Sequence, residues 1–204
     1  QHYLMTKDDV VRKRNDNLYL GPDYNYDVVD IRQKVEKYGG EMTGADAEDV
    51  AYLIKEGNIV SIFQGRSESG PRALGNRSLL GDVRFDIKRT VNRIKRRQNF
   101  RPFAPAILSE FANEYFDGEM NCYMQYTSQA KHDYSSVTHV DGSARVQIVT
   151  PKCETILRPI LEEYYEKTGV PMLLNTSLNI KGQPMVDNWQ DALDFQKMYG
   201  VKVF

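Results

Sequence analysis

Apolar residues recur every three or four positions in five segments of the chain, which is the spacing of one face of an α-helix. In the clearest case Val50, Leu53 and Ile54 form the apolar stripe, and Asp46 is a candidate N-cap. Gly169 follows another stripe, at the position where glycine commonly ends a helix. The segments predicted to be helical are residues 26–38, 46–56, 86–99, 155–168 and 189–199.

Short apolar runs between these segments predict β-strands. They are residues 58–64, 104–108, 145–149 and 170–174. Helices that alternate with strands favour an α/β or α+β domain built around a mixed β-sheet. We expect this domain to cover residues 46–204, and residues 1–45 to form a lead-in segment or linker.

The loop after the first predicted strand departs from this pattern. Residues 65–78 combine glycines with Arg66, Arg72 and Arg77, a mixture for which an apolar core has no use. Glycine lets the backbone approach a ligand closely, and arginine carries a planar fork of donors that fits phosphate or carboxylate oxygens. The loop therefore predicts the edge of a site for a phosphate-bearing ligand.

The composition is that of an ordinary globular domain, but the charge is unevenly spread. The 204 residues are 41% hydrophobic and 27% charged, with a net charge of −1. Between Arg84 and Arg101 the sequence has eight basic residues and only Asp86 as an acid. A basic cluster on a nearly neutral protein favours a local anionic ligand over a long polynucleotide track.

Three further features of the sequence predict a cytoplasmic protein. No run of eighteen apolar residues indicates a membrane-spanning helix, and the first residues do not resemble an export leader. Cys122 and Cys153 are far apart in the sequence and form no C-x-x-C pair, which is typical of reduced structural thiols.

Three more segments deliver polar or basic side chains from the end of a predicted element. Residues 95–101 and 139–145 contribute cations, and residues 175–179 place hydrogen-bonding side chains at a strand end, where ligands commonly bind in open sheets. Together with the loop at 65–78 they predict a pocket for a nucleotide and a second phosphate. His139 and Asp141 are too few for a metal site, and we expect them to stabilise a turn.

Four motifs carry these candidate residues. They are G-P-R-A-L-G-N-R-S at 70–78, F-R-P-F-A-P at 100–105, H-V-D-G-S-A-R-V-Q at 139–147 and L-L-N-T-S at 173–177, followed by G-Q-P at 182–184. In this order they resemble the C-terminal part of the NodU/CmcH-type O-carbamoyltransferases. The resemblance covers residues 18–204.

The resemblance implies a YrdC-like fold, a twisted mixed β-sheet flanked by helices. It implies an enzyme domain that binds ATP and carbamoyl phosphate and forms carbamoyl adenylate, releasing phosphate and pyrophosphate. An N-terminal actin-like domain, absent from these residues, would be its partner and would transfer the carbamoyl group to a hydroxyl acceptor. Mg²⁺ is expected with ATP, but no carboxylate pair in the sequence marks its ligands.

Catalysis of adenylyl transfer depends mainly on positioning and on cations that neutralise developing charge. By resemblance, Lys95 and Arg101 match the Lys and Arg that hold phosphates, and Arg72 is assigned to carbamoyl phosphate or to the carbamoyl end of the adenylate. Arg96 and Arg97 are expected to lie on a solvated face. The other predicted ligand-binding residues are Arg66 and Arg77 near Arg72, Arg145 for phosphate, and Asn175, Ser177 and Asn179 for the adenylate.

The sequence departs from the family pattern at Gln98 and Gln183, where glutamates are expected, and these changes affect local pairing more than chemistry. Two alternatives remain. One is a YrdC-like module that binds nucleic acid through the basic segment 88–97, against which the near-zero net charge counts. The other is a threonylcarbamoyl-adenylate synthase, in which bicarbonate and threonine replace carbamoyl phosphate. The carbamoyltransferase motifs favour the carbamoyl-adenylate-forming domain over both alternatives.

Overall fold

The structure of the protein is a computed structural model that describes residues 18–22, 24 and 26–204. The first seventeen residues of the predicted lead-in lie outside the described residues. The helices are α2 Val28–Lys37, α3 Ala47–Lys55, α4 Lys88–Ile94, the 3₁₀ turn η1 Ser109–Phe111, α5 Ala112–Tyr115, α6 Leu157–Thr168 and α7 Trp189–Tyr199. The strands are β1 Val60–Phe63, β2 Arg77–Gly81, β3 Ala104–Leu108, β4 Phe116–Asp117, β5 Ser128–Ala130, β6 Ser143–Ala144, β7 Gln147–Val149, β8 Met172–Ser177 and β9 Lys202–Val203.

Six of the strands form one mixed sheet in the order β7-β3-β8-β2-β1-β9. The two outer pairs, β3–β7 and β1–β9, are parallel, and the inner pairs are antiparallel. Strand β8 lies inside the sheet, where Asn175 is paired with Leu80 on one side and Ala104 on the other. The predicted mixed sheet flanked by helices is confirmed.

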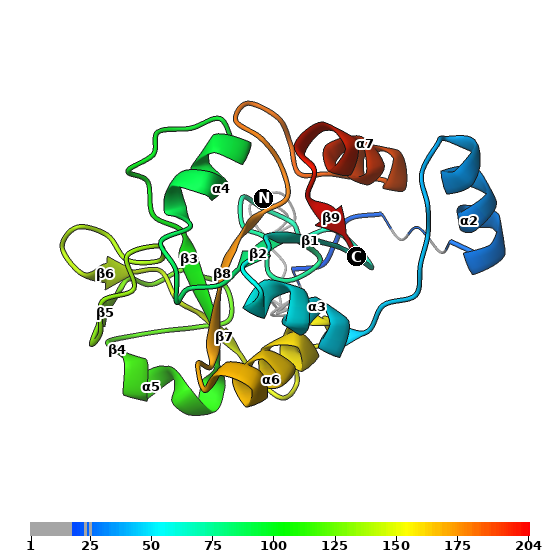
Figure 1. The fold of residues 1–204 in the computed structure, drawn as a ribbon. Coiled ribbons are helices and arrows are strands. Elements are labelled where there is room, and N and C mark those ends of the chain that lie inside the picture. The colour runs from blue at the N-terminus through cyan, green and yellow to red at the C-terminus, as the bar shows by residue number, and fades with distance from the viewer. Residues whose placement is uncertain (1–17, 23, 25) are drawn as a thin grey trace, which may run out of the picture.

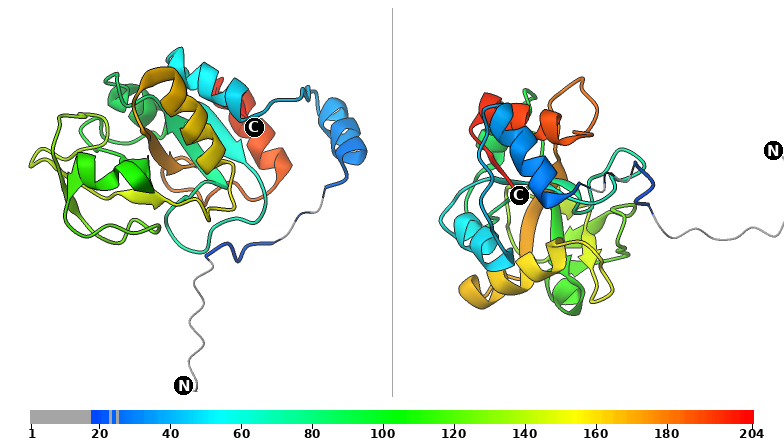
Figure 2. Two further views of the ribbon diagram at one scale, coloured as in Figure 1. Left: turned by 90° about the horizontal axis from the view of Figure 1, so that it is seen from below. Right: turned by 90° about the vertical axis from the view of Figure 1, so that its right-hand side faces the viewer.

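Helices cover both faces of this sheet (Figure 1). Helices α3 and α6 pack on one face, and α4 and α7 lie on the other. Helix α2 stands at one side of the molecule, next to α7, as both views of Figure 2 show. Its buried residues Ile31 and Val35 pack against Leu193 of α7. The molecule therefore has three layers, with α2 as an attachment at the edge.

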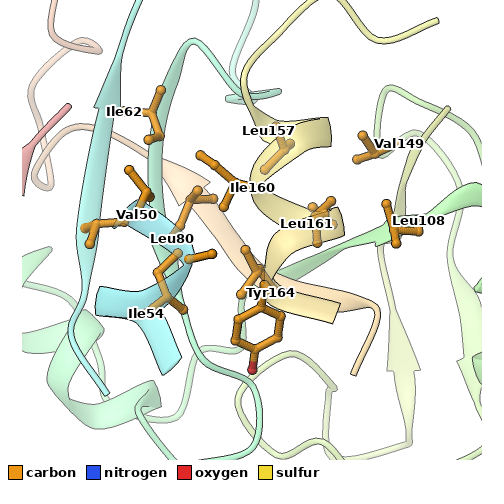
Figure 3. Close-up of a cluster of buried hydrophobic side chains, with 14 residues drawn as sticks. Val50, Ile54, Ile62, Leu80, Leu108, Val149, Leu157, Ile160, Leu161 and Tyr164 are labelled. Carbon is orange, nitrogen blue, oxygen red and sulfur yellow. The ribbon is translucent and has the colours of Figure 1, made fainter. Parts of the chain in front are cut away.

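The largest apolar cluster joins α3 and α6 to the sheet (Figure 3). Because successive strand residues point to opposite faces, Leu80 of β2 packs in this cluster whereas Leu79 packs against α7. The labelled members of the cluster are Val50, Ile54, Ile62, Leu80, Leu108, Val149, Leu157, Ile160, Leu161 and Tyr164.

Local chemistry explains where the main helices begin and end. Asp46 begins α3 with a capping box, in which its side chain accepts the N–H of Asp49 while the Asp49 side chain accepts the N–H of Asp46. Gly169 ends α6 in the left-handed conformation, with φ of 69°. Helix α4 is shorter than the predicted 86–99, because the chain leaves the helix at Lys95 and Arg96 has a φ of 51°.

A small three-stranded antiparallel sheet, β4-β5-β6, lies beside the β7 edge of the main sheet (Figure 1). It was not predicted from the sequence, since each of its strands has only two or three residues. Its last strand, β6, leads directly into Arg145 and then β7. The small sheet thus fixes the position from which Arg145 projects.

Candidate functional site

Three arginines from separate parts of the chain line one cleft. Arg72 belongs to the loop between β1 and β2, Arg97 follows α4, and Arg145 lies between β6 and β7. Asn175 and Ser177, at the end of β8, line the same cleft, which has a volume of about 100 Å³. The structure therefore brings together four segments that are spread over more than a hundred positions of the sequence.

The electrostatics of this cleft are strongly positive. Burial lowers the pKa of Arg145, and the nearby charge of Arg72 lowers it further. Burial lowers the pKa of Arg97 to about 10, with additional contributions from the charges of Arg101 and Arg145. The described residues that line the cleft include no carboxylate. Since these cations repel one another, an anion between them would be bound by all of them.

Arg97 was expected on a solvated face, and the structure corrects this prediction. Its Nε donates to Asn92 Oδ1 at 2.5 Å. Its guanidinium lies over the Phe103 ring, 4.2 Å from the ring centroid, which is a contact distance. Asn92 is itself fully buried and donates to the Arg101 carbonyl. These contacts hold Arg97 against the cleft. Arg96, its neighbour, is exposed as predicted.

Lys95 lies under the end of β8. It is 5% exposed, and its Nζ donates to the backbone oxygens and side chains of Ser177 and Asn179. Burial lowers the pKa of Lys95 to about 7, and the charge of Arg97 adds to this shift. Ser177 Oγ also donates to Asn179 Oδ1 at 2.7 Å. Three predicted site residues therefore form one hydrogen-bonded unit beside the cleft.

Arg101 and Arg72 are the least constrained cations of the group. Arg101 is exposed, and its effect on the pKa of Arg97 places it close to the cleft. Arg72 is half-buried, and its Nη1 donates to the carbonyl of its neighbour Pro71 at 3.2 Å. Neither guanidinium has an ion-pair partner among the described residues. Both can turn toward an incoming anion.

Two larger hollows adjoin the cleft and share residues with it. One, of about 610 Å³, is lined by Glu68, Ser177, Asn179 and Asp187. The other, of about 430 Å³, shares Arg72 and Arg145 with the cleft. A ligand larger than a single phosphate can therefore extend from the cleft on either side.

Arg77 was predicted beside Arg72 as a ligand-binding residue, and the structure corrects this assignment. Arg77 begins β2 and is fully buried, with 0% exposure. Its five N–H groups are all committed, and its guanidinium covers the Phe63 ring at 4.0 Å. The backbone oxygens that accept from it belong to Gln64, Gly65, Asn76, Val186 and Asp187. Arg77 has no donor left for a ligand.

Arg66 also lies apart from the cleft. It is exposed, and its Nε donates to the Gly21 carbonyl at 2.7 Å, which ties the loop to the segment before α2. Arg66 is absent from the described lining of the cleft and of both adjoining hollows. Its predicted role in binding therefore has no geometric support here.

The loop that carries Arg72 is held from two sides by residues that the sequence analysis did not single out. On one side, Glu68 is 5% exposed and its Oε1 accepts the backbone N–H groups of Leu74 and Asn76 at 2.6 and 2.9 Å. On the other side, buried Gln147 donates to the Leu74 carbonyl at 3.0 Å. Gln147 ends one of the recognised motifs and Glu68 lies in the loop at 65–78, but the polar character of both residues gave no indication of burial.

Other predictions concern metals, turns and membranes. Asp141 Oδ1 accepts from the backbone N–H and the hydroxyl of Ser143, so the predicted turn-stabilising role of Asp141 is confirmed. Within the part of the chain that the structure describes, no three His, Cys, Asp or Glu side chains gather as metal ligands would. In the same residues, none of the helices combines the length and apolar character needed to cross a membrane.

Comparisons with known proteins agree with the resemblance of the motifs. The family model described as "Carbamoyltransferase C-terminus" matches residues 51–204. Nodulation protein NolNO of Sinorhizobium fredii is 38% identical over 196 residues, covering 89% of this chain and 29% of that protein. Nodulation protein U of the same organism is 36% identical over 151 residues, covering 71% of this chain and 27% of that protein. The chain spans less than a third of the length of these relatives.

A solved structure supports the fold. Full-length HypF, crystallised in a phosphate- and nucleotide-bound form, superposes with a TM-score of 0.54 at 20% identity, over 78% of this chain and 20% of that one. At this level of identity the likeness concerns the fold, and it agrees with the predicted YrdC-like mixed sheet. With the family model covering most of the domain, the chain belongs to the carbamoyltransferase C-terminal family, related to the NodU and NolO proteins.

Proposed function

We propose that this domain binds ATP and carbamoyl phosphate and joins them into carbamoyl adenylate. The observation that carries the proposal is the convergence of Arg72, Arg97 and Arg145 on one cleft that also contains Asn175 and Ser177. Phosphoryl and adenylyl transfer need cations positioned around charged oxygens, and these arginines would supply them. Nucleotide and phosphate bound to the HypF relative support the same class of ligand.

The proposed reaction has two steps. Water cleaves carbamoyl phosphate into carbamate and phosphate, and a carbamate oxygen then attacks the α-phosphorus of ATP, from which pyrophosphate leaves. Arg72 and Arg145 would hold the phosphoryl group of carbamoyl phosphate, because both line the cleft and lie close enough for the charge of Arg72 to lower the pKa of Arg145. Arg97 and the exposed Arg101 would neutralise charge that develops on the nucleotide phosphates.

Lys95 would act mainly through its neighbours. Its ammonium group already holds Ser177 and Asn179, and it adds positive potential beneath the cleft. Ser177 and Asn179 line the adjoining hollow, from which they would contact the adenylate. This arrangement makes the unit a positioning element for the nucleotide.

Mg²⁺ would arrive with ATP and supply charge neutralisation at its phosphates. Of the two carboxylates that line the hollow next to the cleft, Asp187 is exposed and would hold the ion, whereas Glu68 is buried and accepts the backbone N–H groups of Leu74 and Asn76. Transfer of the carbamoyl group to a hydroxyl acceptor would need the N-terminal actin-like domain as partner, since the chain covers less than a third of its full-length relatives.

Removal of one cleft arginine should weaken ligand binding without unfolding the domain. We expect Arg72→Met, Arg97→Met and Arg145→Met each to lower the affinity for ATP or carbamoyl phosphate about tenfold or more, since a charge-assisted hydrogen bond contributes roughly 1.5–3 kcal/mol. Titration calorimetry measures the affinities, and pyrophosphate release with ATP, Mg²⁺ and carbamoyl phosphate measures the reaction.

Arg89→Met is the matched control, because it removes one positive charge from the exposed surface of α4. Its affinities should equal those of the unaltered protein. Equal weakening in the control and in the three cleft variants would show that only net charge matters. That outcome would remove the site assignment.

A further inference from the structure

One buried acceptor atom, on a residue that lines the cleft, has no hydrogen-bond partner among the residues that the structure describes. Asn175 is 1% exposed and lines the cleft, and its Oδ1 is buried without a hydrogen bond. Its Nδ2, in contrast, donates to the Ala73 carbonyl at 3.1 Å and to Gln147 Oε1 at 2.7 Å. Buried polar atoms are nearly always hydrogen-bonded, so an orphaned oxygen in a ligand cleft calls for an explanation.

The orientation of the Asn175 amide is fixed by its surroundings. Gln147 donates its Nε2 to the Leu74 carbonyl, which leaves Gln147 Oε1 facing Asn175 as an acceptor. The Ala73 carbonyl is also an acceptor only. Two acceptors therefore require the nitrogen of the Asn175 side chain, and a rotated amide would place oxygen against oxygen. Oδ1 of Asn175 can only accept.

The residue that carries this acceptor lines a cleft whose other polar groups are mostly donors. Arg72, Arg97 and Arg145 offer N–H groups suited to anionic oxygens, and a simple anion such as phosphate would satisfy them. A fully deprotonated oxyanion such as sulfate has no donor for Asn175, and hydrogen phosphate has only its single P–OH group. A ligand that combines anionic oxygens with an N–H group would satisfy both the arginines and the orphaned oxygen.

We propose that Asn175 Oδ1 accepts a hydrogen bond from the amino group of carbamoyl phosphate and so selects a carbamoyl group over acyl groups that lack N–H. This inference rests on the proposed function, because it assigns carbamoyl phosphate to the arginine-lined cleft. The cleft volume of about 100 Å³ suits one phosphoryl group with a small acyl substituent. Sites that pair with a polar ligand group reject analogues without that group, because their own buried atom stays unpaired.

The test compares three probes on the same protein: carbamoyl phosphate, acetyl phosphate and inorganic phosphate. Acetyl phosphate replaces the amino group with a methyl group of similar size. In the unaltered protein we expect carbamoyl phosphate to bind roughly tenfold more tightly than acetyl phosphate. In Asn175→Leu and Asn175→Ser the two acyl phosphates should bind equally, while inorganic phosphate still binds. Asn113→Ser, on the exposed surface of α5, is the control that should keep the preference.

The outcomes distinguish a failure of this inference from a failure of the proposed function. Equal affinity for the two acyl phosphates in the unaltered protein overturns the inference and leaves the proposed function standing. A preference that survives in Asn175→Ser also overturns it. No binding of ATP or of any of the three probes by the unaltered protein overturns both. If thermal unfolding shows that Asn175→Leu does not fold, Asn175→Ser and the unaltered protein decide the question.

Discussion

Arg77 carries a permanent charge in the centre of the molecule, and no ion pair with it exists among the described residues. Burial lowers its pKa, while the charges of Glu68 and Asp187 act in the opposite direction. The guanidinium is stabilised instead by backbone oxygens from the start of the loop after β1 and from the segment after β8. Arg77 therefore joins the start of the glycine-rich loop to the chain that leads into α7.

Replacement of Arg77 should destabilise the fold strongly. Arg77→Lys keeps the charge but offers three donors on a flexible stem in place of five in a planar fork, so several buried oxygens would lose their partners. We expect the free energy of unfolding to fall by about 3 kcal/mol or more. Urea denaturation measures it, and Arg66→Lys at the exposed end of the same loop should change it by less than about 0.5 kcal/mol. A loss in Arg77→Lys as small as in Arg66→Lys would contradict this role.

The sequence indicated which residue types the site would use more clearly than which copies of them. Arg72 and Arg145 were expected near one another, and both line the cleft. The predicted locations of Arg77 and Arg97 were the reverse of those found, since Arg77 is in the core and Arg97 lines the cleft. A motif does not reveal that backbone carbonyls surround Arg77, because two of them, of Val186 and Asp187, come from a segment far away in the sequence.

At the level of elements, α6 is fastened to η1 by ion pairs as well as by apolar packing. Arg158 of α6 is 11% exposed, and it donates to both oxygens of Glu110 in η1 and to Glu162 one turn along the helix. These hydrogen bonds from Arg158 lower the pKa of Glu110 to about 2. The pair links the helix that covers the sheet to the turn that follows β3.

This link gives the fold an acid-dependent contribution to stability. Because the pKa of Glu110 is lower in the folded protein than its ordinary value of 4.5, the contribution is fully present above pH 4.5 and is lost as the pH falls toward 2. Glu110 is 44% exposed, so we expect at most about 1 kcal/mol from the pair. Urea denaturation across this pH range should show a shallower acid loss for Glu110→Gln. Identical pH profiles for the two proteins would exclude this role of Glu110.

The elements themselves were largely predictable, and the exceptions have physical causes. Apolar period and caps located α3, α6 and α7 to within a few residues. Strand β2 was missed because it begins with Arg77 and Ser78, polar residues that are buried through hydrogen bonds and not through apolar character. The end of α4 was placed too late, since Arg96 adopts a left-handed conformation that its residue type does not suggest.

At the scale of the whole molecule, positive charge is concentrated around the end of β8. Three arginines line the cleft, and Lys95 lies beneath it with a pKa of about 7. The sequence anticipated that cations would gather there. It did not anticipate that Lys95 would be buried under Ser177 and Asn179, because this depends on the turn after α4 meeting the end of a central strand.

Binding of an anion should therefore depend on pH near neutrality. As the pH rises from 6 to 9, Lys95 loses its proton around pH 7, the positive potential of the cleft falls, and the affinity for anions should decrease several-fold. Sulfate is a suitable probe because its own charge is constant over this range. Calorimetric titration measures the effect, and in Lys95→Met the affinity should be lower at pH 6 and nearly independent of pH.

The same group makes an opposite contribution to folding. Since the pKa of Lys95 is lower in the folded than in the unfolded protein, the unfolded chain binds more protons between about pH 7 and 10.5, and the stability from this group rises over that interval.

One outcome would contradict the binding prediction. If the affinity for sulfate in the unaltered protein stays constant between pH 6 and 9, Lys95 does not titrate there and this account of its charge is wrong.

The central position of β8 has a consequence for how the site moves. Asn175 and Ser177 are not on a flexible lid but on a strand bonded to β2 and β3 on its two sides. Their amide hydrogens should exchange with solvent only when the main sheet separates, at the same slow rate as the deepest part of the core. A ligand bound at the end of β8 should consequently protect the entire domain from proteases, and not merely the loops around the cleft.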